Sequence, residues 1–419
     1  MCTSRAGLPR LRRQCSPPDL FPRQRSASRD ICSCPTSSQP RTLSARFSPP
    51  SAGNLHSSVL GRGRNSHGPL FTNPLRRVTM SVRPTTLALL LFFGTTFLFF
   101  SLFAPRFATA SNMENLMSGF SFLAILAIGQ SFPILLRGID LSIGAIVALA
   151  GMVAFDLTLI FHVPGYLVLP AALAAATLAG TLNGALIVYL RLQPFIATLA
   201  TLAVYRGLVY SISGRQLVRG LSTTPITDRW ITDLETYYDL GSAVGLSRFI
   251  KFPWFPLSFF VMLALLAVFQ SVLITTRFGR DIYAVGGNLE AARLAGINTR
   301  RTTIAAYAIC GFCAGIAALI LVARLTTSTE ALGTGMELTA IAAAVIGGVS
   351  LSGGVGSVFG PAIGAFLLGV ILLGLTLLGV SQFVQQILTG AILLGAIGYD
   401  RLLVVRRQRR TAVFLAERA

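Results

Sequence analysis

Several polar side chains interrupt long apolar runs in this 419-residue chain. Asp140 and Ser142 lie in the string Gly138-Ile-Asp-Leu-Ser-Ile-Gly144, and the string Gly348-Val-Ser-Leu-Ser-Gly-Gly354, which holds Ser352, repeats its G-x-x-L-S-x-G pattern. Both strings join two apolar segments. Glycines and serine hydroxyls at such points suit breaks in membrane helices, where exposed backbone lines a polar path. Two tight helix–helix turns capped by Ser or Asp explain the pattern equally well.

Other polar residues lie within or beside apolar segments, where they are costly and often functional. An arginine at the bilayer centre costs about 2.5–3.5 kcal/mol on insertion scales. Arg206 therefore either extends its guanidinium outward or lines a cavity. Arg324 and Glu337 flank a short Gly- and Thr-rich loop, where pairing or solvation would satisfy both. The candidate residues for a polar translocation path are Asp140, Ser142, Asn183, Arg206, Glu337 and Ser352.

Residues 276–301 form a polar segment between two apolar runs, and their five arginines exclude this segment from lipid. Within it, Glu290-Ala-Ala is followed by Gly296, an EAA-x-x-x-G pattern. A short helix with small residues on one face and a glycine stop suits docking into a pocket of another protein. A membrane chain that presents such a helix is expected to be driven by a partner.

Motifs for catalysis and for ATP binding are missing from the sequence. The single lysine, Lys251, follows Phe249-Ile250, so a G-x-x-x-x-G-K-[ST] phosphate-binding loop is impossible. Only His162 lies beyond the first 79 residues, which argues against a histidine-based zinc or general-base site. Cys310 and Cys313 lie in an apolar run and are expected to be packing residues. No catalytic residue, metal or cofactor is therefore expected, and any energy source must lie on another chain.

Composition indicates an all-α polytopic membrane protein. The chain is 53% hydrophobic and 12% charged, whereas soluble domains carry about a quarter charged residues. Its apolar runs are near the length of about 20 residues that a helical span needs. About ten transmembrane helices are predicted, several of them short or broken by Gly and Pro. The predicted segments are 85–104, 116–136, 141–161, 166–190, 194–213, 254–275, 303–323, 337–350, 358–379 and 383–400.

Small residues also recur at helical spacing in two of these segments. The patterns are Gly311-x-x-x-Gly315 and Gly360-x-x-x-Gly364. In a membrane such pairs let two helix backbones approach closely. We therefore expect helix packing at both places.

The net charge of +20 is unevenly distributed. Residues 1–79 contain 13 Arg and 2 acidic residues, while residues 80–419 contain 21 Arg, 1 Lys and 13 acidic residues. Arginines in short loops favour the cytoplasmic side. They place both termini, the loop 276–302 and the tail 406–419 inside, and the loop 214–253 outside. The basic head has no nucleic-acid-binding motif, so no nucleic-acid partner is expected.

The N-terminal 79 residues are expected to lie outside the functional domain, which we assign to residues 80–405. They are rich in Arg, Ser and Pro and show no helical or strand periodicity, which predicts disorder. Met80-Ser-Val-Arg before an apolar run resembles a natural start, so the extension could reflect a start codon annotated too far upstream. A solvated tail and an organellar transit peptide are the alternatives.

The ordered motifs along residues 83–405 resemble the ribose-type sugar permeases of bacterial ABC importers. The motifs that carry this resemblance are Gly138-Ile-Asp-Leu-Ser-Ile-Gly144, Pro194-Phe-Ile-Ala-Thr-Leu199, Arg206-Gly207, Thr276-Arg-Phe-Gly-Arg280, Tyr283-Ala-Val-Gly-Gly-Asn288, Ala292-Arg-Leu-Ala-Gly-Ile297, Ala323-Arg324, Gly333-Thr-Gly335, Glu337-Leu338, Ile341-Ala-Ala343, Val345-Ile-Gly-Gly348 and Leu351-Ser-Gly-Gly354. The family often has Gly-Gly or Ser-Gly before Ile-Asp-Leu-Ser, whereas this chain has Arg137-Gly138. The loop 214–253 is also distinctive.

The resemblance implies a type II-like ABC importer permease that moves a monosaccharide across the bacterial inner membrane. It implies two permease copies, identical or not, in the lipid bilayer, together with ATP-binding subunits and a periplasmic sugar-binding protein. The family's coupling helix maps onto the segment around Gly287–Gly296. The candidate ATPase-coupling residues are Arg277, Gly279, Gly286, Gly287, Asn288, Glu290, Ala291, Ala292 and Gly296.

The alternatives are another cargo for the same kind of importer, and a different class of transporter. The cargo could be a nucleoside or another small polar solute, because the binding protein sets most of the specificity in such systems. An ion-driven secondary transporter would need buried carboxylates for coupling, and Asp140 and Glu337 are the candidates. A membrane enzyme is disfavoured because the chain lacks a catalytic constellation.

Overall fold

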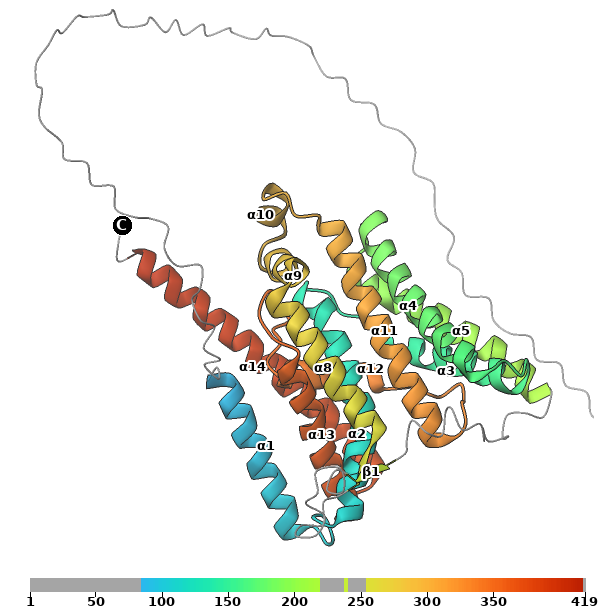
Figure 1. Ribbon diagram of the computed structural model, residues 1–419. Helices are drawn as coiled ribbons and strands as arrows, with labels where there is room; N and C mark the ends of the chain where they lie inside the picture. The colour runs from blue at the N-terminus through green and yellow to red at the C-terminus, as the bar shows by residue number, and fades with distance from the viewer. Residues whose placement is uncertain (1–83, 219–236, 240–253, 417–419) are drawn as a thin grey trace, which may run out of the picture. The chain divides into compact units, whose positions relative to one another are not determined.

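The computed structural model describes residues 84–218, 237–239 and 254–416. The N-terminal extension 1–79 and most of the loop 214–253 lie outside the described residues. The described chain is almost entirely helical (Figure 1). One short antiparallel pair joins β1 (Tyr237–Asp239) to β2 (Trp254–Pro256).

Ten helices correspond to the ten predicted apolar segments. They are α1 (Pro84–Phe103), α2 (Ala110–Leu135), α3 (Ile143–Leu159), α4 (Gly165–Tyr189), α5 (Pro194–Val218), α8 (Leu257–Thr275), α11 (Thr299–Leu325), α12 (Met336–Ile346), α13 (Phe359–Leu377) and α14 (Gln382–Ala416). Two further helices, α9 (Arg277–Gly287) and α10 (Leu289–Leu294), lie in the polar segment. The all-α prediction is confirmed.

Seven helices of the described chain are long and apolar enough to cross a membrane, as expected of a multi-pass membrane protein. The apolar parts of the other three are shorter, at Leu87–Phe103, Ile143–Leu159 and Met336–Ile346. The number of ten spans therefore stays a prediction. α14 runs well beyond the predicted end near residue 400. No glycine or proline follows Gly398, and arginine is a good helix former, so the basic tail continues the helix.

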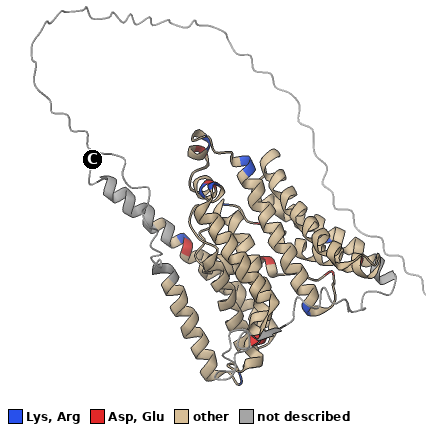
Figure 2. Ribbon diagram, viewed as in Figure 1, with Lys and Arg blue, Asp and Glu red and all other residues tan. Residues whose placement is uncertain are grey.

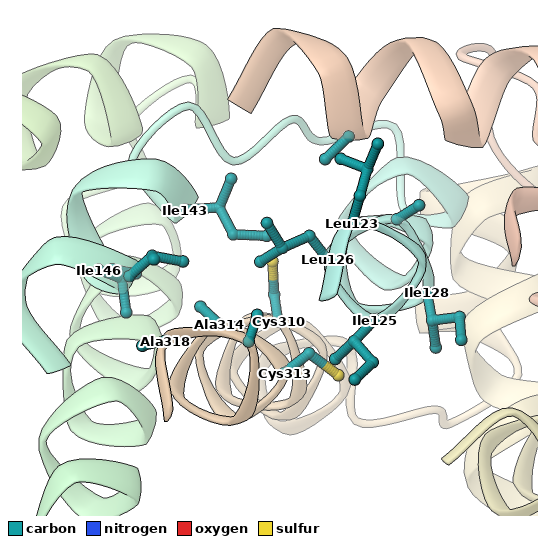
Figure 3. Packing of buried hydrophobic residues seen from close by; sticks show 14 of the residues in the cluster. Leu123, Ile125, Leu126, Ile128, Ile143, Ile146, Cys310, Cys313, Ala314 and Ala318 are labelled. Carbon is teal, nitrogen blue, oxygen red and sulfur yellow. The ribbon is translucent and has the colours of Figure 1, made fainter. Parts of the chain in front are cut away.

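The main core lies where α2, α3 and α11 meet (Figure 3). Leu126 from α2, Ile146 from α3 and Ala314 from α11 are fully buried there. Cys310 and Cys313 are also fully buried as free thiols. No group of three or more His, Cys, Asp or Glu side chains in the described regions could hold a metal ion. Their complete burial within the apolar cluster shows that these two cysteines pack in the core, as the sequence predicts.

The small-residue patterns mark close helix crossings. A methyl group on Gly311 would lie 2.4 Å from the Ala176 carbonyl oxygen of α4. A methyl group on Gly364 would lie 2.2 Å from the Ala343 carbonyl oxygen, so α13 meets α12 equally closely. Only glycine permits such backbone contact, and the packing prediction is confirmed at both patterns.

Charge is distributed as a membrane protein requires. Figure 2 shows that most of the helical ribbon carries neither acidic nor basic residues. Charged residues gather at helix ends and in α9 and α10, which lie at one end of the helices (Figures 1 and 2). Of these two helices, α10 is exposed at all its residues except Ala292, whereas α9 buries one face against the bundle.

Candidate functional site

Asp140 lies fully buried in the loop between α2 and α3. Its Oδ1 accepts hydrogen bonds from the Ser142 backbone N–H at 2.9 Å and from the Ser142 hydroxyl at 2.7 Å. The carboxylate thus closes a turn directly before α3, while Ser142, the N-cap residue of α3, makes no side-chain capping bond. A buried carboxylate is stable only when donors surround it, and the remaining donors come from other helices.

Asn183 of α4 provides the next donors. Its Nδ2 lies 2.7 Å from the Ser142 hydroxyl and 3.3 Å from Asp140 Oδ2. Asn183 Oδ1 lies 3.1 Å from the hydroxyl of Tyr205, a residue of α5. The same hydroxyl lies 2.9 Å from the Ala179 carbonyl oxygen. The structure therefore brings together three of the six candidate path residues and links α3, α4 and α5 through them.

The loop that carries Asp140 is also held from α2, α5 and α11. The Gln130 amide, in the orientation that satisfies both of its ends, accepts from the Asp140 N–H at 3.0 Å and donates to the Asp140 carbonyl at 3.3 Å. The Thr198 hydroxyl of α5 donates to the Ile139 carbonyl at 3.1 Å. Tyr307 of α11 fits against Gly138, where a methyl group would lie 2.3 Å from its hydroxyl. Movement of this loop would therefore disturb α2, α5 and α11, and also α4 through Asn183.

Arg206 and Glu337 lie apart from the Asp140 cluster. Arg206 Nη1 donates to the Glu330 carbonyl at 2.7 Å and to the Leu332 carbonyl at 2.8 Å. The guanidinium thus holds the loop between α11 and α12. Glu337 Oε1 accepts from the Gly335 N–H at 3.2 Å at the start of α12.

Glu337 nevertheless lies beside the first turn of α3. A methyl group on Gly144 would be 2.3 Å from Glu337 Oε2 and 2.4 Å from the Gly333 carbonyl oxygen. Oε2 is buried and has no hydrogen-bond partner in the described part of the chain. Gly144 is two residues from Ser142, so Glu337 borders the polar cluster without bonding to it.

Ser352 lies in the loop between α12 and α13, and this loop meets α2 and α9. Ser352 N–H donates to the Ser350 hydroxyl at 3.3 Å, and the Gly354 N–H donates to the Leu135 carbonyl at 2.9 Å. The Tyr283 hydroxyl of α9 donates to the Gly356 carbonyl at 2.8 Å. The loop with the second string therefore contacts α2, whose C-terminus leads into the loop with the first string, and it also contacts α9.

The polar segment folds into two capped helices. The Thr276 hydroxyl accepts from the Gly279 N–H at 3.2 Å and caps α9. Asn288 Oδ1 accepts from the N–H groups of Glu290 and Ala291 at 3.0 and 3.1 Å and caps α10. Gly296, with φ of +80°, follows the end of α10. The predicted short helix with a glycine stop is confirmed.

The surface of α10 is mostly exposed. Ala292 is buried against the chain, whereas Ala291 is exposed and Leu294 is 90% exposed. Glu290 and Arg293 form an exposed ion pair of 3.0 Å, the single one among the described residues. A solvated pair of this kind contributes little to stability. Leu294 thus lies exposed beside a single solvated ion pair.

The comparison with known proteins identifies the family. The family described as "branched-chain amino acid transport system / permease component" matches residues 112–397. The chain belongs to this permease family. The permease is 36% identical over 309 residues to the ribose import permease protein RbsC of Haemophilus influenzae, covering 73% of this chain and 90% of the relative. No solved structure matches the permease.

Two further relatives extend the comparison. The permease is 38% identical over 300 residues to RbsC of Escherichia coli K12, covering 72% of this chain and 88% of that protein. It is 34% identical over 340 residues to the xylose transport system permease protein XylH of the same strain, covering 70% and 86%. These relatives confirm the resemblance to ribose-type sugar permeases.

Three residues of the permease's buried site were not among the predicted site residues. They are Gln130, Tyr205 and Thr198, which hold the Asp140 loop or Asn183. Gln130 and Tyr205 lie in apolar helices outside any motif, whereas Thr198 lies within the Pro194–Leu199 string. A glutamine inside the apolar run of α2 was a usable signal, because an amide in a membrane helix needs a partner. Tyr205 gave a weaker signal beside the more conspicuous Arg206.

Proposed function

We propose that this chain is the permease subunit of an ATP-driven importer for a monosaccharide. The observation that carries the proposal is α10, a capped, solvent-facing helix on a multi-pass membrane protein whose relatives are named sugar import permeases. A helix presented in this way can receive force from a partner that hydrolyses ATP. The chain's own sequence contains no ATP-binding loop.

The proposed assembly follows from this division of labour. ATP-binding subunits would dock on the face that carries α9 and α10, in the cytoplasm. A periplasmic sugar-binding protein would deliver the cargo to the opposite side of the inner membrane. A second permease copy, identical or related, would complete the pore. Both termini of this chain would lie in the cytoplasm, as the arginine distribution predicts.

The proposed translocation path includes Asp140, Ser142 and Asn183. Carboxylate, hydroxyl and amide groups are suited to hydrogen bonding with sugar hydroxyls. The three side chains are fully buried in this conformation, so cargo would reach them only after the surrounding helices separate. Arg206, Glu337 and Ser352 would border the same route at other depths.

Charge reversal on α10 tests the coupling role. Glu290→Lys removes a solvated ion pair, so the expected loss of folding stability is at most about 1 kcal/mol. Gly296→Val strains a left-handed position, where a Cβ costs about 1–2 kcal/mol but meets no neighbour within 4 Å. Both variants should reach the membrane and lose sugar uptake. Glu114→Lys, at the far end of α2 from α9, is the matched charge control.

Two results would overturn the proposal. The first is normal uptake and normal association with the ATP-binding subunit in both α10 variants. The second is sugar transport by the purified chain alone under an ion gradient, which would establish a secondary transporter. Binding measurements on the partner binding protein with a panel of sugars and nucleosides would identify the cargo.

A further inference from the structure

Arg137 occupies a position that normally belongs to glycine. It follows the C-terminus of α2, where its N–H donates to the Ile134 carbonyl and the Gly138 N–H donates to the Pro133 carbonyl, both at 2.9 Å. This pair of bonds is the Schellman arrangement, whose first residue beyond the cap is left-handed and usually glycine. Arg137 has φ of +64°. The Cβ of Arg137 therefore has a conformational cost in this left-handed position, and an interaction of the side chain is expected to offset it.

The guanidinium of Arg137 provides that interaction. Its Nε donates to the Gly286 carbonyl at 2.7 Å, and its Nη2 donates to the Gly287 carbonyl. These carbonyls are the last two of α9 and have no partner within that helix. A cation at a helix C-terminus is also favoured by the helix dipole. Arg137 thus joins the end of α2 to the end of α9.

The contact of Arg137 with Gly286 and Gly287 lies along the chain between α10 and the cluster of Asp140, Ser142 and Asn183. Asn288, which caps α10, directly follows the Gly287 carbonyl that Arg137 binds. On the other side, Asp140 is three residues from Arg137 in a loop that Gln130 and Thr198 fix to the bundle. The Arg137 side chain therefore bridges two distant segments, because Gly286 and Gly287 lie 149 and 150 residues after it in the chain.

We propose that Arg137 is a positioning residue that transmits movement of α10 to the loop carrying Asp140. A shift of the end of α9 would act on the guanidinium through two hydrogen bonds and hence on the turn that begins α3. Packing reinforces this route, because a methyl group on Gly353 would lie 2.4 Å from Arg137 Cγ. The inference rests on the proposed docking of an ATP-binding subunit on α10.

Arg191 provides a matched control for Arg137. It follows the C-cap of α4 as Arg137 follows that of α2, has φ of +54°, and is exposed. Its side chain makes no hydrogen bond to any other residue that the structure describes. Arg191→Ala removes the same charge, and Arg191→Gly also relieves the same backbone strain. Neither variant breaks the bridge between α2 and α9.

The test uses the complete importer, with its ATP-binding subunit and binding protein, reconstituted in lipid vesicles. Arg137→Ala and Arg137→Gly should each lower the sugar imported per ATP hydrolysed by about ten-fold or more, a typical coupling effect between sites. The ATP-binding subunit should remain bound, since α10 itself is unchanged. Arg137→Lys keeps the charge but replaces the planar guanidinium by a single ammonium nitrogen, and should recover part of the coupling. Arg191→Ala and Arg191→Gly should stay within about two-fold of the unaltered protein.

A double-variant cycle adds a readout that general destabilisation would not produce. If Arg137 acts through the Asp140 loop, Arg137→Ala should cause little further loss in an Asp140→Asn background. Unchanged coupling in Arg137→Ala and Arg137→Gly, with uptake abolished in Glu290→Lys, would overturn the role of Arg137 and leave the proposed function intact. Loss of the bound ATP-binding subunit in Arg137→Ala would also overturn it. Normal uptake and subunit association in Glu290→Lys and Gly296→Val would instead reject docking on α10.

Discussion

Gly286 of α9 meets the Leu135 carbonyl of α2 so closely that a methyl group on Gly286 would lie 1.8 Å from that oxygen. A methyl group on the next residue, Gly287, would meet no atom within 4 Å. Two adjacent glycines at one helix end therefore have different roles. The first permits contact between α9 and the membrane bundle, and the second leads into the cap of α10.

This difference gives a matched pair of variants. Gly286→Ala should push α9 away from α2, with a cost of about 1–3 kcal/mol for overpacking, and should reduce uptake. Gly287→Ala should keep stability, because its methyl group meets nothing within 4 Å. Thermal melting in detergent and transport in vesicles measure the two effects. Equal behaviour of the two variants would show that the contact does not constrain α9.

The hydroxyl of Tyr205 should matter more than that of Tyr210 on the same helix. Tyr205 is buried and its hydroxyl serves Asn183 and the Ala179 carbonyl, whereas Tyr210 is 59% exposed. Tyr205→Phe should lower stability by about 0.5–1.5 kcal/mol, the net contribution of one hydrogen bond. Tyr210→Phe should change it by less. Chemical denaturation of both variants decides, and a larger loss in Tyr210→Phe would contradict the assigned network.

The helices could be predicted from the sequence because their signal is local. Each predicted apolar segment coincides with a helix, since a membrane span requires a continuous apolar run. The α10 helix was equally accessible, because Asn288 and Gly296 mark its two ends within the same short segment. Residue type and spacing are sufficient where both ends of a feature lie close together in the chain.

The candidate site could be predicted only in part, because its contacts join residues that are far apart in the chain. Asp140 and Asn183 were each recognisable as polar residues near apolar runs, but their contact depends on how α4 packs beside α3. Arg137 was recognisable as a departure from the family pattern. Its partners, Gly286 and Gly287, lie about 150 residues away, and no local pattern connects them.

Removal of the cap on α10 should loosen that helix without unfolding the bundle. Asn288→Ala leaves the N–H groups of Glu290 and Ala291 without their acceptor, at a cost of about 0.5–2 kcal/mol. In a helix of six residues that cost should raise the rate of hydrogen exchange at both amides. Asn288→Ser restores a capping oxygen and should restore slow exchange. If exchange in Asn288→Ala is unchanged, the cap does not stabilise α10.

The crossing of α4 and α11 offers a prediction on stability alone. A methyl group on Gly180 would lie 2.3 Å from the Tyr307 carbonyl oxygen and 2.9 Å from Gly311 Cα, so Gly180→Ala should force the helices apart. Gly207, within α5, has nothing within 4 Å, and Gly207→Ala should stabilise the helix by up to about 1 kcal/mol. The same substitution should therefore shift the melting temperature in opposite directions at the two positions. Parallel shifts would mean that helix propensity, and not backbone contact, governs the crossing.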